Sequence, residues 1–225
     1  MRAARRGDNL GARRRPSLTI SGGGPNFPPP WQVPEDWERM PEENPTHVMD
    51  EADVRREIAR LAREIVERNE GTDRLVLMGV HRRGTQIAAL LRGAIEEATG
   101  AVVPTGSIDI TLYRDDLGTI GPRPVIGETE LPPDGIDDMN VVLVDDVAYT
   151  GRTMRAAMNE LSDWGRPKRI LFCVLVDRGG RELPIQPDFT GKVVEVGEGR
   201  RVDVRVSELD GRLGVELVRK EPEGA

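Results

Sequence analysis

The amino-acid sequence predicts an α/β protein built on a mostly parallel, twisted sheet with helices on both faces. Two observations support this class. Short apolar runs typical of buried strands alternate with segments of helical periodicity, and one such run ends in two acids followed by a glycine-containing turn and a helix. The length of 225 residues suits one ample domain. We expect this domain to span residues 48–221, with a short tail at 222–225.

Residues 1–47 differ in composition from the rest of the chain. They contain 8 of the 17 prolines, a run of three glycines and six arginines within the first 15 positions. Such a composition buries too little apolar surface to offset the entropy lost on ordering, so we expect a disordered extension. Its basic start could contact RNA; the alternatives are a solvated tail, or a true start at Met40 or Met49.

The charge and the single cysteine exclude several classes of site. A net charge of -7 argues against nonspecific nucleic-acid binding over the whole surface, so any RNA site must be a local basic patch. Cys173 lies in an apolar run and is interpreted as a small buried hydrophobe. No apolar run reaches about 18 residues and no secretory signal is recognised, so we expect a cytoplasmic protein with no membrane partner.

The first elements of the domain form a helix, a strand, a turn and a second helix. Asp50 is placed as the cap of a helix that ends near Gly71. Its apolar stripe consists of Val54, Ile58, Leu61, Ala62, Ile65 and Val66. The run 75–80 predicts a buried strand, which stops at the polar turn 81–84 and is followed by a helix through Ala98.

The second half continues the alternation after a long excursion. Residues 102–113 predict a strand, and residues 114–139 predict a long loop of the kind that often serves as a lid. A strand at 141–144, a helix from about 151 to 164 and a buried strand at 170–176 follow. The apolar stretches expected to complete the domain as edge strands are 193–196, 202–206 and 215–218.

The segment 141–153 carries the strongest chemical signal. Its buried parallel strand places Asp145 and Asp146 at the carboxyl end, where open α/β sheets bind ligands. The turn 149–153 leads into a helix, so its backbone N–H groups, two hydroxyls and a glycine suit a phosphate monoester. Acids beside an anion site favour a sugar phosphate, because they can accept ribose hydroxyls directly or through Mg²⁺. The alternative is a strand end whose acids merely face solvent.

This segment resembles the binding motif for 5-phosphoribosyl pyrophosphate (PRPP) of type I phosphoribosyltransferases. Two further stretches, residues 106–117 (GSIDITLYRDDL) and 174–185 (VLVDRGGRELPI), resemble the PyrR family of uracil phosphoribosyltransferases and pyrimidine-operon regulators. The resemblance covers roughly residues 49–219. It implies the type I phosphoribosyltransferase fold and the transfer of phosphoribosyl from PRPP to uracil, giving UMP and pyrophosphate, with Mg²⁺ bound to the substrate.

The resemblance also implies roles for individual residues. Asp145 and Asp146 would serve the ribose, and Arg114 on the lid would reach over the pyrophosphate. Arg83 matches the arginine of the pyrophosphate loop, whereas Arg82 is either a further PRPP contact or a solvated side chain. The remaining PRPP and nucleotide contacts are Val147, Ala148, Tyr149, Thr150, Gly151, Arg152 and Thr153. The uracil contacts are Val176, Asp177, Arg178 and Val194.

Two departures from the family pattern flank the base side of the pocket. Gly180 stands where the family usually has histidine, and residues 195–197 (EVG) replace a stretch of Pro-Thr-Ser type. Both leave PRPP binding as expected and bear on catalytic strength and base preference. A phosphoribosyltransferase that accepts a purine base is therefore the alternative enzyme.

Family members also bind a stem-loop in pyrimidine-operon leader mRNA, and uridine nucleotides such as UMP and UTP strengthen this binding. They form dimers or larger assemblies. The expected RNA-binding residues are Arg56, Arg60, Arg63, Arg68 and Arg82. The first three share one helix face. Arg60 with Glu64 and Arg63 with Glu67 could equally form ordinary surface ion pairs, in which case the protein is a phosphoribosyltransferase without an RNA-binding role.

Overall fold

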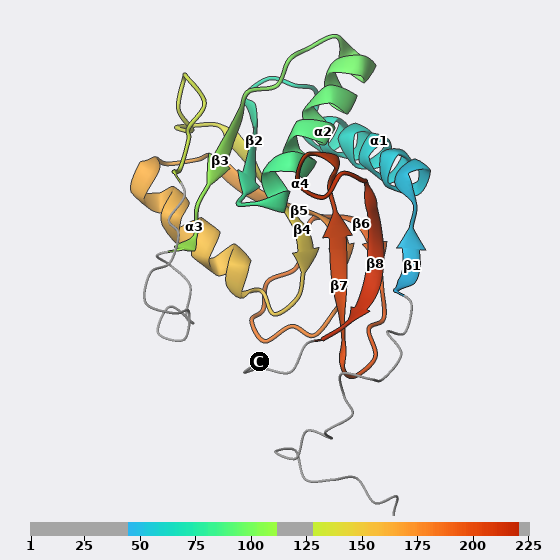
Figure 1. Ribbon diagram of the computed structural model, residues 1–225. Coiled ribbons are helices and arrows are strands. Elements are labelled where there is room, and N and C mark those ends of the chain that lie inside the picture. The colour runs from blue at the N-terminus through green and yellow to red at the C-terminus, as the bar shows by residue number, and fades with distance from the viewer. Residues whose placement is uncertain (1–44, 112–127, 221–225) are drawn as a thin grey trace, which may run out of the picture. The chain divides into compact units, whose positions relative to one another are not determined.

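The structure is a computed structural model that describes residues 45–111 and 128–220. All of these residues belong to one compact unit, 43–225. Its centre is a five-stranded sheet in the order β3-β2-β4-β5-β6, in which every pair of neighbours is parallel (Figure 1). The strands are β2 (Leu75–Val80), β3 (Thr105–Ile108), β4 (Asn140–Ala148), β5 (Arg169–Asp177) and β6 (Phe189–Val193). The predicted fold class is confirmed.

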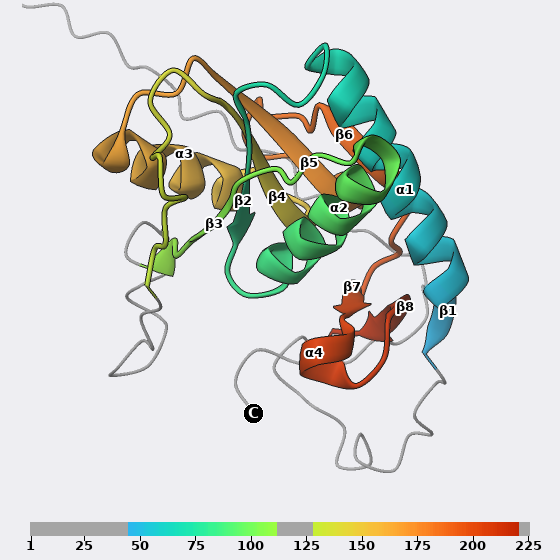
Figure 2. The same cartoon turned by 90° about the horizontal axis from the view of Figure 1, so that it is seen from above.

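Helices cover both faces of this sheet. Helices α1 (Glu51–Arg68) and α2 (Arg83–Thr99) lie on one face and α3 (Arg152–Trp164) lies on the other, as Figure 2 shows. The strands alternate between the two cores: Leu75 and Leu77 pack with α1 and α2, whereas Val76 and Met78 pack with α3. Burial on both faces explains why the strand runs are continuously apolar.

The local signals that predict α1 are borne out. The side chain of Asp50 accepts the backbone N–H of Asp53 at 2.7 Å, and the side chain of Asp53 accepts the N–H of Asp50 at 3.2 Å, forming a reciprocal capping box. Of the predicted apolar stripe, five residues are buried and the sixth, Val66, is partly buried against them. No helix among the described residues is long and apolar enough to cross a membrane.

The structure contains a second sheet, which the sequence does not predict. Strands β1 (Thr46–Met49), β8 (Gly214–Arg219) and β7 (Arg200–Arg205) form an antiparallel sheet in that order, and the short helix α4 (Ser207–Asp210) connects β7 to β8 (Figure 1). Of the expected edge strand 193–196, only Val193 belongs to a strand, β6. The expected edge strands 202–206 and 215–218 correspond to β7, which is an edge strand, and to β8, which is the central strand of this second sheet. Their close connection favours pairing with each other, and β6 ends the main sheet.

Two boundaries also differ from expectation. Strand β1 begins at Thr46, inside the segment interpreted as a disordered extension, and Thr46 pairs with Leu217 of β8. Strand β3 is shorter than the expected 102–113, and Ser107 forms an isolated antiparallel bridge with Glu130, where the described chain resumes after the excursion. Residues 112–127, which include 114–127 of the expected excursion, lie outside the described residues.

Candidate active site

The two acids stand at the carboxyl end of the central strand, as predicted. Strand β4 runs on to Ala148, so both acids lie near its end, between β2 and β5. Asp145 is aligned with Val174 of β5 and is only 7% exposed. Each acid carboxylate accepts the backbone N–H of the next residue at 2.9 Å. Among the described residues, neither acid forms an ion pair.

The surroundings of this acid pair, Asp145 and Asp146, favour the uncharged form of both carboxyl groups. Burial raises the pKa of Asp145 well above its ordinary value, and the negative charge of Asp146 raises it further. Burial also raises the pKa of Asp146, although the positive charge of Arg83 works against that shift. A buried acid pair of this kind is suited to hydroxyl groups or a cation supplied by a ligand.

The predicted pyrophosphate loop packs directly on the strand that carries the acid pair. A Cβ atom on Gly84 would lie 2.4 Å from the carbonyl oxygen of Val144 and 3.2 Å from the Cα atom of Asp145. Only a residue without a side chain permits this approach. Arg82 is exposed and precedes α2, while Arg83 is its first residue and is partly buried. The structure thus brings Arg83 beside the acid pair.

The predicted phosphate turn leads into the N-terminus of α3. Gly151, at φ 91°, lies in the left-handed region and precedes the helix without a side-chain cap. The backbone carbonyl of Thr150 accepts the N–H groups of Glu182 and Leu183, both at 3.0 Å, which fixes the turn against the loop after β5. Arg152 pairs with Glu182 at 2.7 Å. Because α3 is 13 residues long, its first N–H groups provide a favourable anion site.

The predicted base side is organised by Arg181, which lies in the stretch 174–185 but is not among the expected site residues. Arg181 donates to the carboxylate of Asp177 at 2.7 Å and to the carbonyl of Tyr149 at 2.7 Å. Asp177 also accepts the N–H of Gly179 at 2.9 Å. The carboxylate of Asp177 is therefore engaged within the loop. The backbone N–H of Val194 donates to the carbonyl of Asp177 at 2.9 Å, which holds the end of β6 beside this loop.

Tyr149 gives a physical account of the Gly180 departure. The guanidinium of Arg178 lies 4.1 Å from the centre of the Tyr149 ring, a cation–π contact. A Cβ atom on Gly180 would lie 2.5 Å from Cε2 of the same ring, and Gly180 has φ 74°. A histidine there would displace the tyrosine. The stack of Tyr149 and Arg178 thus occupies the space that a side chain at position 180 would need.

Four of the five arginines expected to bind RNA are exposed on α1 and have partners within the chain, whereas the fifth, Arg82, is exposed just before α2. Arg56 pairs with Asp53, and Arg60 pairs with Glu57 and Glu64 at 2.8 Å each. The other contacts link Arg60 to the carbonyls of Thr190 and Gly191, Arg63 to the carbonyl of Ala59, and Arg68 to Asp188 and the Phe189 ring. The predicted Arg60–Glu64 pair is present. Among the described residues Arg63 forms no pair with Glu67.

Two expected features are not placed by these contacts. Arg114, expected on the lid, lies outside the described residues. Within residues 45–111 and 128–220, no group of three or more histidine, cysteine or acidic side chains could hold a metal ion. Cys173 is buried, and burial raises the pKa of its thiol, in agreement with a structural role.

Comparisons with known proteins define the family. Residues 48–202 match the model of the phosphoribosyl transferase domain, which places the chain among the phosphoribosyltransferases. "Bifunctional protein PyrR" of Herpetosiphon aurantiacus is 54% identical over 166 residues, which cover 74% of this chain and 92% of the relative. The protein of the same name from Thermus aquaticus is 52% identical over 174 residues, covering 77% and 96%. The chain therefore belongs to the PyrR family.

Solved structures support the same fold. The hypoxanthine phosphoribosyltransferase of Trypanosoma cruzi superposes with a TM-score of 0.59 at 19% identity, covering 78% of this chain and 97% of that chain. The enzyme of that name from Staphylococcus aureus gives a TM-score of 0.56 at 18% identity, covering 80% and 94%. At these identities the likeness establishes the fold alone.

Proposed function

We propose that the protein transfers phosphoribosyl from PRPP to uracil, producing UMP and pyrophosphate. The observation that carries this proposal is the position of the acid pair. It lies between the predicted pyrophosphate loop, whose Gly84 packs on β4, and the turn 149–153 that leads into the N-terminus of α3. These three features match the ribose, the pyrophosphate and the 5-phosphate of one ligand. The transition state carries positive charge on the ribose, so the enzyme's task is to orient the base and stabilise the leaving pyrophosphate.

The acid pair also fits Mg²⁺ that arrives with PRPP. A largely buried pair of carboxylates that forms no ion pair among the described residues favours a divalent ion, yet one oxygen from each carboxylate falls short of the six ligands that Mg²⁺ requires. The remaining ligands would come from the substrate and water. Asp145 and Asp146 would hold the ion or the ribose hydroxyls, and the ion would neutralise charge on the pyrophosphate.

The leaving group and the base fall to different loops in this proposal. Arg83 and, on closure of the lid, Arg114 would contact the pyrophosphate, since an arginine fork offers two donors to phosphate oxygens. Uracil would be read by backbone groups at 176–178 and near Val194, because the Asp177 side chain is already engaged by Arg181. The Tyr149–Arg178 stack would border the base.

A side-by-side assay tests the enzyme and its alternative. The full-length chain is incubated with PRPP, Mg²⁺ and either uracil, hypoxanthine or guanine, and product nucleotides are quantified. UMP formation with little reaction of the purines supports the proposal. Preferential use of a purine would contradict the choice of base while leaving PRPP transfer intact. No nucleotide from any base would reject the enzyme.

We propose regulation by RNA as the second function. The curated relatives carry the name bifunctional, and five arginines lie along α1 in this chain, four of which are expected to contact RNA. Binding of the leader stem-loop of pyrimidine-operon mRNA, strengthened by UMP or UTP, would use this arginine face (Arg56, Arg60, Arg63 and Arg68). Arg60 also contacts the carbonyls of Thr190 and Gly191, just before the proposed base-reading strand end. Titration of the protein with the stem-loop, with and without UMP, tests this function.

A further inference from the structure

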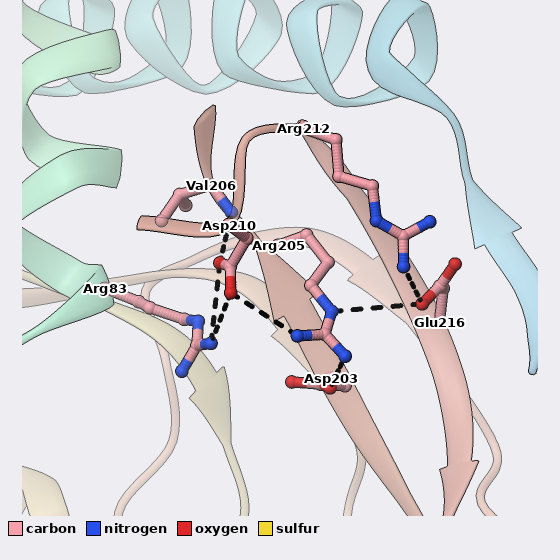
Figure 3. Close-up of polar contacts among 7 residues, drawn as sticks. All are labelled: Arg83, Asp203, Arg205, Val206, Asp210, Arg212 and Glu216. Carbon is pink, nitrogen blue, oxygen red and sulfur yellow. Dashed lines mark hydrogen bonds and ion pairs between the residues drawn. The ribbon is translucent and has the colours of Figure 1, made fainter. Parts of the chain in front are cut away.

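Arg83 is shared between the proposed pyrophosphate site and the second sheet. Its Nη2 atom donates to Oδ1 of Asp210 at 3.1 Å and to Oδ2 at 3.4 Å, across 127 sequence positions (Figure 3). Its backbone is fixed at the start of α2 by the close packing of Gly84 on β4. Arg83 thus has one anchor in the main sheet and a second in the α4 segment.

Asp210 is itself held firmly. Its side chain is 12% exposed, and its Oδ2 atom accepts the N–H of Val206 at 2.9 Å. Arg205 approaches Oδ1 at 3.4 Å. Burial opposes ionisation, but the hydrogen bonds from Val206 and Arg83 outweigh it and hold the pKa of Asp210 below its ordinary value. The acceptor for Arg83 is therefore a fixed carboxylate.

The surrounding charges are balanced only when Arg83 is included. Arg205 pairs with Asp203 at 2.6 Å and lies 3.9 Å from Glu216, which Arg212 contacts at 2.8 Å (Figure 3). The cluster therefore holds three carboxylates, of Asp203, Asp210 and Glu216, and three guanidinium groups, of Arg83, Arg205 and Arg212. Withdrawal of Arg83 would leave one carboxylate without its cation, so the contact favours one position of that arginine.

The geometry points to Asp210 as a positioning residue that holds Arg83 toward the leaving pyrophosphate. This inference rests on the proposed function, in which Arg83 binds that group. Only Nη2 of Arg83 engages Asp210, so Nη1 and Nε take no part in the contact. A long side chain with one end of its fork fixed loses less freedom on binding a ligand than an unanchored one. Without Asp210, the nearby acid pair would attract the guanidinium into the space of the ribose hydroxyls.

The test compares Asp210→Asn with Glu208→Gln, which removes the same charge from an exposed position on α4. Isothermal titration measures binding of pyrophosphate with Mg²⁺, and separately of UMP, whose phosphate uses the turn 149–153. Asp210→Asn is expected to weaken pyrophosphate binding roughly tenfold, because Arg83 no longer has its charge-assisted hydrogen bond, and to raise the KM for PRPP. UMP affinity and the KM for uracil should stay near the unmodified values, as should every value for Glu208→Gln.

A double-mutant cycle with Arg83→Gln separates positioning from general damage. If Asp210 acts through Arg83, Asp210→Asn causes no further loss of pyrophosphate affinity in the Arg83→Gln background. Equal losses in both backgrounds, equal weakening of UMP and pyrophosphate, or tighter pyrophosphate binding would overturn the inference. If Asp210→Asn does not fold, Asp210→Glu replaces it: the charge remains but is displaced, and the same selective loss is expected, whereas unchanged pyrophosphate binding counts against the inference. If the unmodified chain binds neither PRPP nor pyrophosphate, the proposed function itself fails.

Discussion

The acid pair and the arginine face of α1 are both rich in charge, but they meet opposite physical conditions. Asp145 is buried, Asp146 is partly buried, and neither forms an ion pair among the described residues; burial raises the pKa of both acids. The arginine face is largely exposed, and each of its four side chains already has a partner within the chain. The first region is incomplete without a ligand, whereas the second is complete without one.

This contrast explains why the two proposed functions stand on different support. A buried charge that forms no ion pair costs stability, so its presence at a strand end indicates a ligand. An exposed arginine with an intramolecular acid is common on any helix and contributes little to stability. The transfer reaction is therefore supported by the structure's own physics, and RNA binding depends more on the family.

The largest expected effect tests the first region. Asp145→Asn combined with Asp146→Asn should lower the rate of UMP formation by about a hundredfold or more, since the ribose and its cation lose their charged ligands. The measurement is steady-state UMP production from saturating PRPP and uracil. Glu96→Gln with Glu97→Gln, two exposed neutralisations on α2, serves as the control and should keep full activity. Unchanged activity in the Asp145 and Asp146 variant would sink the proposed role of the acid pair.

The next effect tests whether the second region does more than pair with itself. Arg60→Ala with Arg63→Ala should weaken stem-loop binding roughly tenfold and reduce the slope of log affinity against log salt by about one for every phosphate that is no longer neutralised. Filter binding across a salt series measures both. Arg92→Ala with Arg201→Ala removes the same charge from exposed positions elsewhere.

Arg60 needs one further check because it also contacts β6. Loss of its bonds to the carbonyls of Thr190 and Gly191 could disturb the base side. UMP affinity of the double variant, measured by titration without RNA, should remain unchanged if the loss is confined to the RNA face. RNA affinity that falls equally in the Arg92 and Arg201 control would point to bulk charge instead of a defined face.

Much of the main sheet is predictable from the sequence, and the reason is physical. Strands buried on both faces leave uninterrupted apolar runs, so 75–80, 141–144 and 170–176 can be recognised from composition alone. The second sheet has strands that mix buried and more exposed residues, and such a pattern does not reveal which sheet a strand joins. Strand β1, with four residues, is too short to show a period.

The site divides in the same way. The acid pair and the phosphate turn are contiguous in sequence, so their proximity follows from one strand–turn–helix unit. The contacts of Arg83 with Asp210 and of Arg181 with Tyr149 join segments far apart in the chain, and no local pattern encodes them. Gly180 departs from the family pattern in the sequence itself, but the physical reason, the Tyr149 ring, follows only from a contact between distant segments.

A smaller effect should appear in stability and its pH dependence. Because burial raises the pKa of Asp145 and Asp146, the folded state holds their protons more tightly than the unfolded chain, so their protonation stabilises the protein at low pH. That contribution is lost as pH rises from about 4 through the raised pKa values. The Asp145→Asn, Asp146→Asn variant should therefore have a higher melting temperature than the unmodified protein near neutral pH, and the difference should shrink toward pH 4. Each kcal/mol of difference in stability corresponds to roughly 2–4 °C in melting temperature.

Thermal melts in Mg²⁺-free buffer across this pH range measure the difference. The Glu96→Gln, Glu97→Gln control should melt in parallel with the unmodified chain, because those side chains are exposed. A difference in melting temperature that does not change with pH would mean that burial does not raise the pKa of the acid pair. The contrast with the arginine face would then lose its physical basis.

The smallest effect isolates the packing that holds the first region in place. Gly179 and Gly180 both have positive φ, 68° and 74°, but a Cβ atom on Gly179 meets nothing within 4 Å, whereas one on Gly180 meets the Tyr149 ring. Each alanine substitution should cost about 1–2 kcal/mol for the left-handed backbone. Only Gly180→Ala should also raise the KM for uracil, by a few-fold at most, because Tyr149 and its stacked Arg178 must shift. Equal uracil KM values in the two variants would show that the Tyr149–Arg178 stack does not border the base, and would confine the ligand-dependent region to the acids and the phosphate turn.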